Sequence, residues 1–207
     1  MKHNLTTAAG VFAAAMLGLV AAPFAASAAP ADSVPASGRL SFDVIRKGKD
    51  IGDYVVTFRG SGADLTVDLR TDVRVKVPVI GVSAYSFKQH STETWRGGKL
   101  TSLRSQTDDN GTPHEISVGA SPLIPASLWA ADLVRAGKVL NTIDGSTDAI
   151  KVRKLGTESI ATGAGPVQAT HYAVTGGLNR DLWYAGGKLV HVRFAAEDGS
   201  VIDYTLR

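Results

Sequence analysis

Hydrophobic and polar residues alternate along much of the chain after residue 38, and the clearest alternation covers residues 65–77. Apart from Thr71, the odd positions are apolar: Leu65, Val67, Leu69, Val73, Val75 and Val77. All the even positions are polar or charged. A repeat of two residues is the period of a β-strand with one buried and one solvated face. A strand of this length, about 43 Å, must twist or bend, as in barrels and curled sheets.

Shorter runs repeat this alternation at residues 40–44, 54–58, 85–95, 190–194 and 202–206. Glycine-containing turn signals separate the runs, at 47–50, 60–62, 97–98, 109–111, 144–145, 176–177, 186–187 and 198–199. Such residues adopt positive φ angles at little cost, as tight hairpins require. The sequence therefore predicts an all-β fold, a strongly curved antiparallel sheet of roughly ten or eleven strands arranged as a half-barrel, barrel or β-spiral.

One segment, residues 125–137, departs from the alternation. Leu128, Ala131 and Leu133 fall roughly on one helical face, with Ser127 placed as an N-cap and Gly137 as a stop. We expect one short helix over residues 127–136, covering an open end or edge of the sheet.

The first 28 residues have the pattern of a secretory signal peptide. A short basic start precedes an uncharged, mostly apolar run at residues 8–22, and small residues follow at 26–28. A membrane anchor is the alternative, but this run is shorter than the about 20 residues of a spanning helix. We therefore expect a protein exported to the periplasm, or secreted, with no transmembrane segment after cleavage. Residues 29–37 would be a flexible tether and residues 38–207 a single β-rich domain.

Composition excludes several classes of function. Without cysteine the chain forms no disulfide, thiolate metal site or catalytic thiol, and carries no lipoprotein anchor. The 22 Lys and Arg against 19 Asp and Glu are too even for a nucleic-acid binder that neutralises phosphates. The sequence lacks the common nucleotide-binding, hydrolase and zinc motifs, so we expect neither a cofactor nor a metal.

The run 85–95 provides a candidate site. If its aromatic residues face the interior, the alternation places Glu93 beside them, and a buried carboxylate must be paired, hydrogen-bonded or raised in pKa. This describes a polar patch in a cavity, which could bind a ligand or act as an acid or base. The structural alternatives are a Glu93–Arg104 pair across neighbouring strands and a strand end in water. The candidate cavity residues are Tyr85, Phe87, Gln89, Glu93, Trp95, Arg104, His114 and Trp129. His114 and the tryptophans could equally be ordinary core residues.

Several segments occur together in an order that resembles a known family: residues 42–44, 51–54, 93–100, 107–111, 125–129, 181–184 and 198–206. They resemble an uncharacterised family of exported proteobacterial proteins with a domain-of-unknown-function label. This resemblance implies export and a β-rich domain, and it supplies no activity. The expected architecture is also similar, more loosely, to the half-barrel periplasmic carriers of lipids and lipoproteins.

Three hypotheses for function follow from these patterns. The first is a periplasmic binding or carrier module for a hydrophobic small molecule or lipid, held in the curve of the sheet. The second is an envelope structural or interaction protein that binds a protein partner through an exposed sheet edge. The third is an enzyme that uses Glu93 as general acid or base, assisted by His114 or Arg104.

Overall fold

The computed structural model describes residues 31–76 and 83–207. Within these residues the chain forms thirteen strands: β1 (Arg39–Arg46), β2 (Lys49–Ser61), β3 (Asp64–Lys76), β4 (Ser83–Arg96), β5 (Lys99–Asp109), β6 (Thr112–Val118), β7 (Ile124–Pro125), β8 (Lys138–Leu140), β9 (Thr147–Thr162), β10 (Gly165–Gly176), β11 (Arg180–Ala185), β12 (Lys188–Ala195) and β13 (Val201–Leu206). Two short 3-10 helices accompany them, η1 (Ala31–Ser33) and η2 (Ala131–Arg135). The all-β prediction is confirmed. The strand number exceeds the expected roughly ten or eleven because alternation does not reveal strands as short as β7 and β8.

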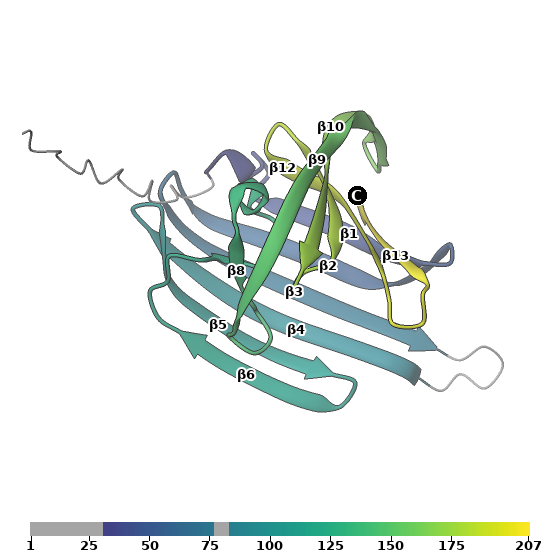
Figure 1. Cartoon of the computed structure of the whole chain (residues 1–207), viewed down its shortest axis with the longest axis horizontal. Coiled ribbons are helices and arrows are strands. Elements are labelled where there is room, and N and C mark those ends of the chain that lie inside the picture. Colours follow the sequence, from purple (N-terminus) through teal and green to yellow (C-terminus); the bar gives the residue numbers. More distant parts are fainter. Residues whose placement is uncertain (1–30, 77–82) are drawn as a thin grey trace, which may run out of the picture.

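The strands form one sheet in the order β6-β5-β4-β3-β2-β1-β13-β12-β11-β10-β9-β8-β7. Neighbouring strands are antiparallel, except for the short parallel contact of β7 with β8. Within the described part of the chain no ladder joins the edge strands β6 and β7, so the sheet curls without closing. Figure 1 shows β2 to β5 as long neighbouring strands, with β9 and β10 crossing the molecule above them.

Strand β3 has the two faces that the alternation predicts. Its odd-numbered residues from Leu65 to Val73 are buried on the inner side of the sheet, whereas Arg70 and Asp72 are exposed on the outer side. Residue 77 of the predicted strand lies outside the described residues. The inner faces of the other strands add to the same apolar core, which includes Phe42 and Leu182 from distant parts of the chain. This core lies within the curve of the sheet.

The segment from Ile124 to Leu140, which we call the inner segment, packs into this curve instead of forming the predicted helix. The only helical part is the five-residue 3-10 turn η2. Before it, Leu128 has a φ angle of 68°, in the left-handed region, and Trp129 is completely buried. The helix prediction over 127–136 is therefore wrong. Leu128, Trp129 and Ala130 are consecutive and all at most 8% exposed, whereas a regular helix with one apolar face would turn part of such a run toward solvent.

The hairpin of β9 and β10 curls over the outer face of β11 to β13. At its tip the backbone N–H of Gly163 donates to the carbonyl of Leu206 at 2.8 Å, close to the chain's C-terminus (Figure 1). A second, smaller core lies under the hairpin and is built around Ala169, Trp183 and Val190. The sheet therefore buries apolar side chains on both faces at this end.

The predicted signal peptide, residues 1–28, lies outside the described residues. Of the expected tether, the part from Ala31 onward contacts the inner segment: Ser33 is buried, and its Oγ accepts a hydrogen bond from the N–H of Ala131, in η2, at 2.9 Å. Among the described residues, no helix has the length and apolar character needed to cross a bilayer.

Candidate functional site

Glu93 on β4 points into the core and joins the inner segment to the sheet. Its side chain has no exposed surface, and its Oε2 accepts hydrogen bonds from the indole Nε1 of Trp95 at 3.0 Å and of Trp129 at 3.1 Å. Trp95 belongs to the same strand, whereas Trp129 belongs to the inner segment. The two indoles meet edge to face with centroids 5.9 Å apart, and Trp129 packs against Phe58 in the same way. One carboxylate therefore orients both rings.

Burial raises the pKa of Glu93, while Ser127, Trp95 and Trp129 oppose this effect by stabilising the charged form. The other carboxylate oxygen, Oε1, and the Oγ of Ser127 have no hydrogen bond of normal geometry in the structure, although the hydroxyl is close enough to influence the carboxyl. The inner segment is also held by the hydroxyls of Tyr54 and Tyr184, which donate to the carbonyls of Ser127 and Leu128. Because Glu93 has no exposed surface and its Oε2 already accepts from both indoles, this geometry fits a structural contact better than an acid or base.

The other candidates from the sequence separate in the structure. A bulge opposite Thr94 and Trp95 shifts the β4–β5 register, so Leu103 and not Arg104 lies beside Glu93. Arg104 is exposed on the outer face, and the proposed Glu93–Arg104 pair is therefore wrong. His114 lies half-buried on edge strand β6, opposite Thr107.

A set of small polar side chains lines the inner face of β4 and β5 beyond Glu93. Gln89 Nε2 donates to the carbonyl of Thr142 at 3.1 Å and to the hydroxyl of Thr107 at 3.1 Å, while Ser91 donates to Ser105 at 2.8 Å. Gln89 thus connects β4 to the loop between β8 and β9. The polar inward residues of this region satisfy one another.

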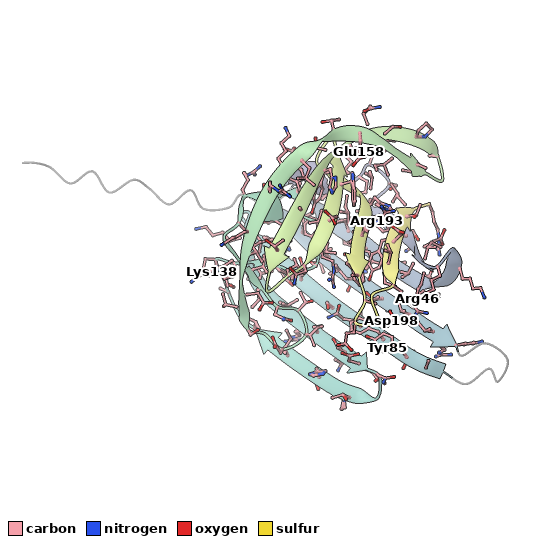
Figure 2. The ribbon with its side chains drawn as sticks, turned by 45° about the vertical axis from the view of Figure 1, so that its right-hand side comes forward. Arg46, Tyr85, Lys138, Glu158, Arg193 and Asp198 are labelled. Carbon is pink, nitrogen blue, oxygen red and sulfur yellow. The ribbon has the colours of Figure 1, made fainter. Side chains whose placement is uncertain are left out.

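The far end of the inner face is aromatic and less deeply buried. We call four side chains the aromatic end: Tyr85 and Phe87, two positions apart on β4, and Phe194 and Tyr204, which contact each other, with Tyr204 also near Tyr85. The rings of Phe194 and Tyr204 are 5.8 Å apart, and Tyr85 is 38% exposed. Burial raises the pKa of Tyr85, and its hydroxyl donates to Asp109 at 2.9 Å; Tyr204 and Glu197 are close enough to raise this pKa further. Figure 2 shows Tyr85 beside the β12–β13 turn.

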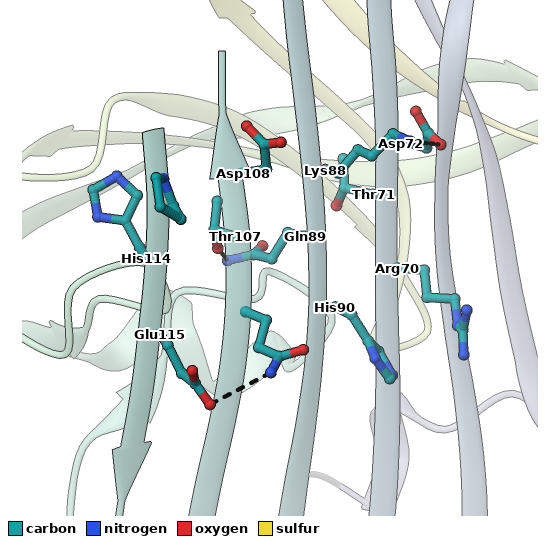
Figure 3. A pocket seen from close by; sticks show the side chains of 12 residues that line it. Arg70, Thr71, Asp72, Lys88, Gln89, His90, Thr107, Asp108, His114 and Glu115 are labelled. Carbon is teal, nitrogen blue, oxygen red and sulfur yellow. Dashed lines mark hydrogen bonds and ion pairs between the residues drawn. The ribbon is translucent and has the colours of Figure 1, made fainter. Parts of the chain in front are cut away.

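On the outer face, β3 to β6 form an open trough of about 730 Å³ (Figure 3). Two rows of outward side chains flank it, first Arg70, His90, Gln106 and Glu115, then Asp72, Lys88, Asp108 and Pro113. Both acidic and basic side chains occur in these rows, and Lys88 is 3.9 Å from Asp72. Such a mixed, solvated surface favours no single charge on a ligand.

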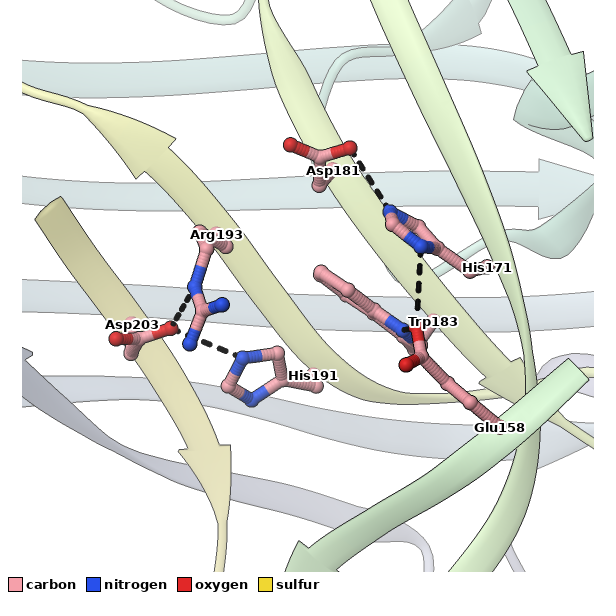
Figure 4. Close-up of polar contacts among 7 residues, drawn as sticks. All are labelled: Glu158, His171, Asp181, Trp183, His191, Arg193 and Asp203. Carbon is pink, nitrogen blue, oxygen red and sulfur yellow. Dashed lines mark hydrogen bonds and ion pairs between the residues drawn. The ribbon is translucent and has the colours of Figure 1, made fainter. Parts of the chain in front are cut away.

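A second polar cluster lies at the smaller core, and we call it the Trp183 cluster (Figure 4). It consists of Glu158, His171, Asp181, Trp183, His191, Arg193 and Asp203. Trp183 stacks on His171 with centroids 4.0 Å apart, and its Nε1 donates to Glu158 at 2.7 Å. His171 lies between Glu158 at 3.1 Å and Asp181 at 2.9 Å. Residues of β9 and β10 are thereby fastened to β11.

His191 completes this cluster on β12. Its Nε2 is 3.0 Å from Asp203, which also accepts from Arg193 Nε at 2.7 Å, while its buried Nδ1 has no hydrogen-bond partner among the described residues. Burial lowers the pKa of His191, and the nearby Asp203 opposes this. The neutral ring therefore donates through Nε2 to the carboxylate.

Sequence reasoning missed the Trp183 cluster because its members are spread over five strands. The available signal was Trp183 itself, which alternates with the apolar Leu182 and Tyr184 and so must lie on the opposite face. A large aromatic side chain on a face expected to be solvated indicates a second covering layer. Within residues 31–76 and 83–207, no group of three or more metal-ligating side chains is placed to hold a metal.

Comparisons with known proteins support the fold. A family model described as a domain of unknown function, DUF6134, matches residues 42–207. Comparison with curated proteins finds no match. Among solved structures, the chain resembles the crystal structure of a β-barrel-like protein of domain of unknown function DUF1849 from Brucella abortus, with a TM-score of 0.54 and 12% identity, over 82% of this chain and 94% of that one. At this identity the likeness concerns the fold alone.

Proposed function

This chain belongs to the DUF6134 family, a domain of unknown function, and we propose that it is an exported module that binds a hydrophobic small molecule or lipid. The single observation that carries this proposal is the aromatic end. There, aromatic side chains on the inner face of the curled sheet remain partly exposed. Exposed apolar groups that gather in one place mark binding sites more often than scattered ones do.

Burial along the inner face supports the aromatic end as the place for a ligand. Next to the inner segment, Trp95, Trp129 and Leu133 have at most 2% of their surface exposed, so the chain itself fills that half. At the aromatic end Phe87, Phe194 and Tyr204 are only partly buried, and Tyr85 is more exposed still. A ligand that covers them would gain the free energy of burying apolar surface, about 25 cal/mol per Å² before the costs of association.

A test compares ligand content in wild type and in variants of the aromatic end. The protein is purified from the periplasmic fraction and examined by native mass spectrometry, followed by solvent extraction. We expect a co-purifying apolar molecule, and we expect Phe87→Ala and Phe194→Ala to reduce it severalfold. Val201→Ala is the matched control, because Val201 is 48% exposed on the outer face of β13. A wild-type protein that carries no molecule and binds no added lipid would contradict the proposal.

Export itself belongs to the proposal and rests on the signal-peptide pattern of residues 1–28. Cell fractionation with an antibody tests it directly. We expect the shortened chain in the periplasm or the medium, and retention of the full-length chain in the cytoplasm would contradict it.

The edge strand β6 supports a second candidate, an envelope protein that binds a protein partner. β6 pairs with β5 on one side only, and its Ile116 and Val118 are half-buried. Pro113 lacks a backbone N–H, which limits the strand's ability to extend the sheet with a partner strand. Crosslinking in intact cells with a photoreactive residue at Ser117, on the outer face of β6, distinguishes this candidate from the carrier.

A further inference from the structure

Arg180 is a cation on the inner face of the sheet, beside the aromatic end. It begins β11, opposite Val174 of β10, and shares its face with the buried Leu182. Its guanidinium carbon lies 3.8 Å from the centroid of the Phe194 ring, in a cation–π contact. The side chain is therefore directed toward the aromatic end and away from the outer surface.

No acidic side chain among the described residues forms an ion pair with this guanidinium. Within the described residues its side chain makes one hydrogen bond, from Nη1 to the carbonyl of Asn179 at 2.8 Å, although an arginine side chain has five N–H donors. Burial lowers the pKa of Arg180, while the Tyr204 hydroxyl favours the charged form. A desolvated cation normally has a partner of opposite charge.

The other arginines of the described residues are either paired with an aspartate or exposed. Five pair with aspartates: Arg46, Arg59, Arg135, Arg193 and Arg207. Those without an acidic partner are exposed in the described residues: Arg39, Arg70, Arg74, Arg96, Arg104 and Arg153. Arg180 combines the absence of an acidic partner with partial burial. The N–H groups of Arg180 that make no hydrogen bond lie beside the aromatic end, where the proposed ligand would bind.

We propose that Arg180 binds the anionic head group of an amphipathic ligand whose apolar part covers the aromatic end. This inference rests on the proposed function and specifies its ligand class. A carboxylate or a phosphate ester suits the planar guanidinium, which offers two parallel N–H donors to two oxygens. Phe194 and Tyr204 lie next to the charge and provide the apolar surface for the chain that follows the head group.

The experiment titrates the protein with three ligands that share one alkyl chain, each below its micelle-forming concentration. Decanoate represents a fatty acid, decyl phosphate represents a phospholipid head group, and decanol is the neutral control. We expect at least one of the anions to bind about tenfold or more tightly than decanol, as charge-assisted hydrogen bonds would provide. The stronger of the two anions identifies the head-group chemistry. Inorganic phosphate should weaken anion binding by the wild type and leave decanol binding unchanged.

Variants locate the effect. Arg180→Met should remove the preference for anions, and Arg180→Lys should keep part of it. Arg104→Met, which removes the same charge from the outer face, should change nothing. Circular dichroism verifies folding, and the phosphate competition tests the wild type if Arg180→Met does not fold. Equal binding of all three ligands, or an unchanged preference in Arg180→Met, would overturn the Arg180 site and leave the binding module intact. Failure of all three to bind would overturn both.

Discussion

Replacing Glu93 by glutamine tests how the inner segment is held. The change keeps the size of the side chain and an oxygen that can accept from both indoles, at 3.0 and 3.1 Å in the wild type. It removes the negative charge and the titratable group. It also places amide N–H donors near Ser127, whose Oγ has no hydrogen bond of normal geometry among the described residues. Glu93→Ala is the contrasting variant, since it leaves both buried indole N–H groups without an acceptor.

The magnitudes follow from burial. Burial raises the pKa of Glu93 above its ordinary 4.5, so between the two values the folded state holds a proton that the unfolded chain releases. The stability contributed by this group is complete below pH 4.5 and falls as the pH rises through the folded-state pKa, by about 1.4 kcal/mol for each unit of elevation. Glu93→Gln should therefore gain stability relative to the wild type with rising pH. Glu93→Ala should lose roughly 2–6 kcal/mol, since each orphaned donor costs about 1–3 kcal/mol.

Urea unfolding followed by far-UV circular dichroism, at pH 5, 6, 7 and 8, provides the measurement. Differences between Glu93→Gln and the wild type cancel the titration of all other groups. We expect the unfolding free energy of Glu93→Gln, relative to that of the wild type, to rise with pH up to the folded-state pKa of Glu93 and then to level off. A difference independent of pH, or a loss of more than about 2 kcal/mol for Glu93→Gln at pH 7, would show that the buried carboxyl of Glu93 does not hold the inner segment in this way.

Three further predictions concern the β9–β10 hairpin and the Trp183 cluster. Because burial lowers the pKa of His191, the wild type should lose stability as the pH falls below about 6.5. In the same urea assay, His191→Gln should lessen the dependence of the unfolding free energy on pH, and an equal dependence in the two proteins would contradict this prediction. Gly163→Val should cost about 1–3 kcal/mol and increase amide exchange at the hairpin tip, since a Cβ there would lie 2.5 Å from the Arg207 backbone. A Cβ at the control site Gly119 would have no atom of the described residues within 4 Å, so equal effects of valine at the two sites would refute the contact. Trp183→Phe should cost about 1 kcal/mol through loss of its indole hydrogen bond, and an unchanged urea midpoint would show that this bond adds nothing.

Alternation predicted most of the sheet because it reports which face of a strand is buried. It identified β3 and the inward position of Glu93, since a period of two is a local property of the chain. It did not locate the inner face of β5, because one extra residue at a bulge reverses the orientation of every residue after it, including Arg104. A bulge of this kind depends on pairing with the neighbouring strand and leaves little signal in a single sequence.

The inner segment shows a different limit of sequence reasoning. Its apolar residues were compatible with a helix, but their partners lie on several strands, and the structure places Leu128 and Trp129 separately among them. Tertiary packing therefore overrode the local helical pattern. The sequence did not predict the unpaired state of Arg180 for a related reason: a missing ion pair can be recognised only once the neighbours of the side chain are known.

Photolabelling can locate a hydrophobic ligand at the aromatic end. The protein is irradiated with a diazirine-bearing decanoate, with and without excess decanoate, and the labelled residues are located by mass spectrometry. We expect labels on Tyr85, Phe87, Phe194 or Tyr204 that excess decanoate displaces. Labels confined to the outer trough of β3 to β6, or no label that decanoate displaces, would contradict it.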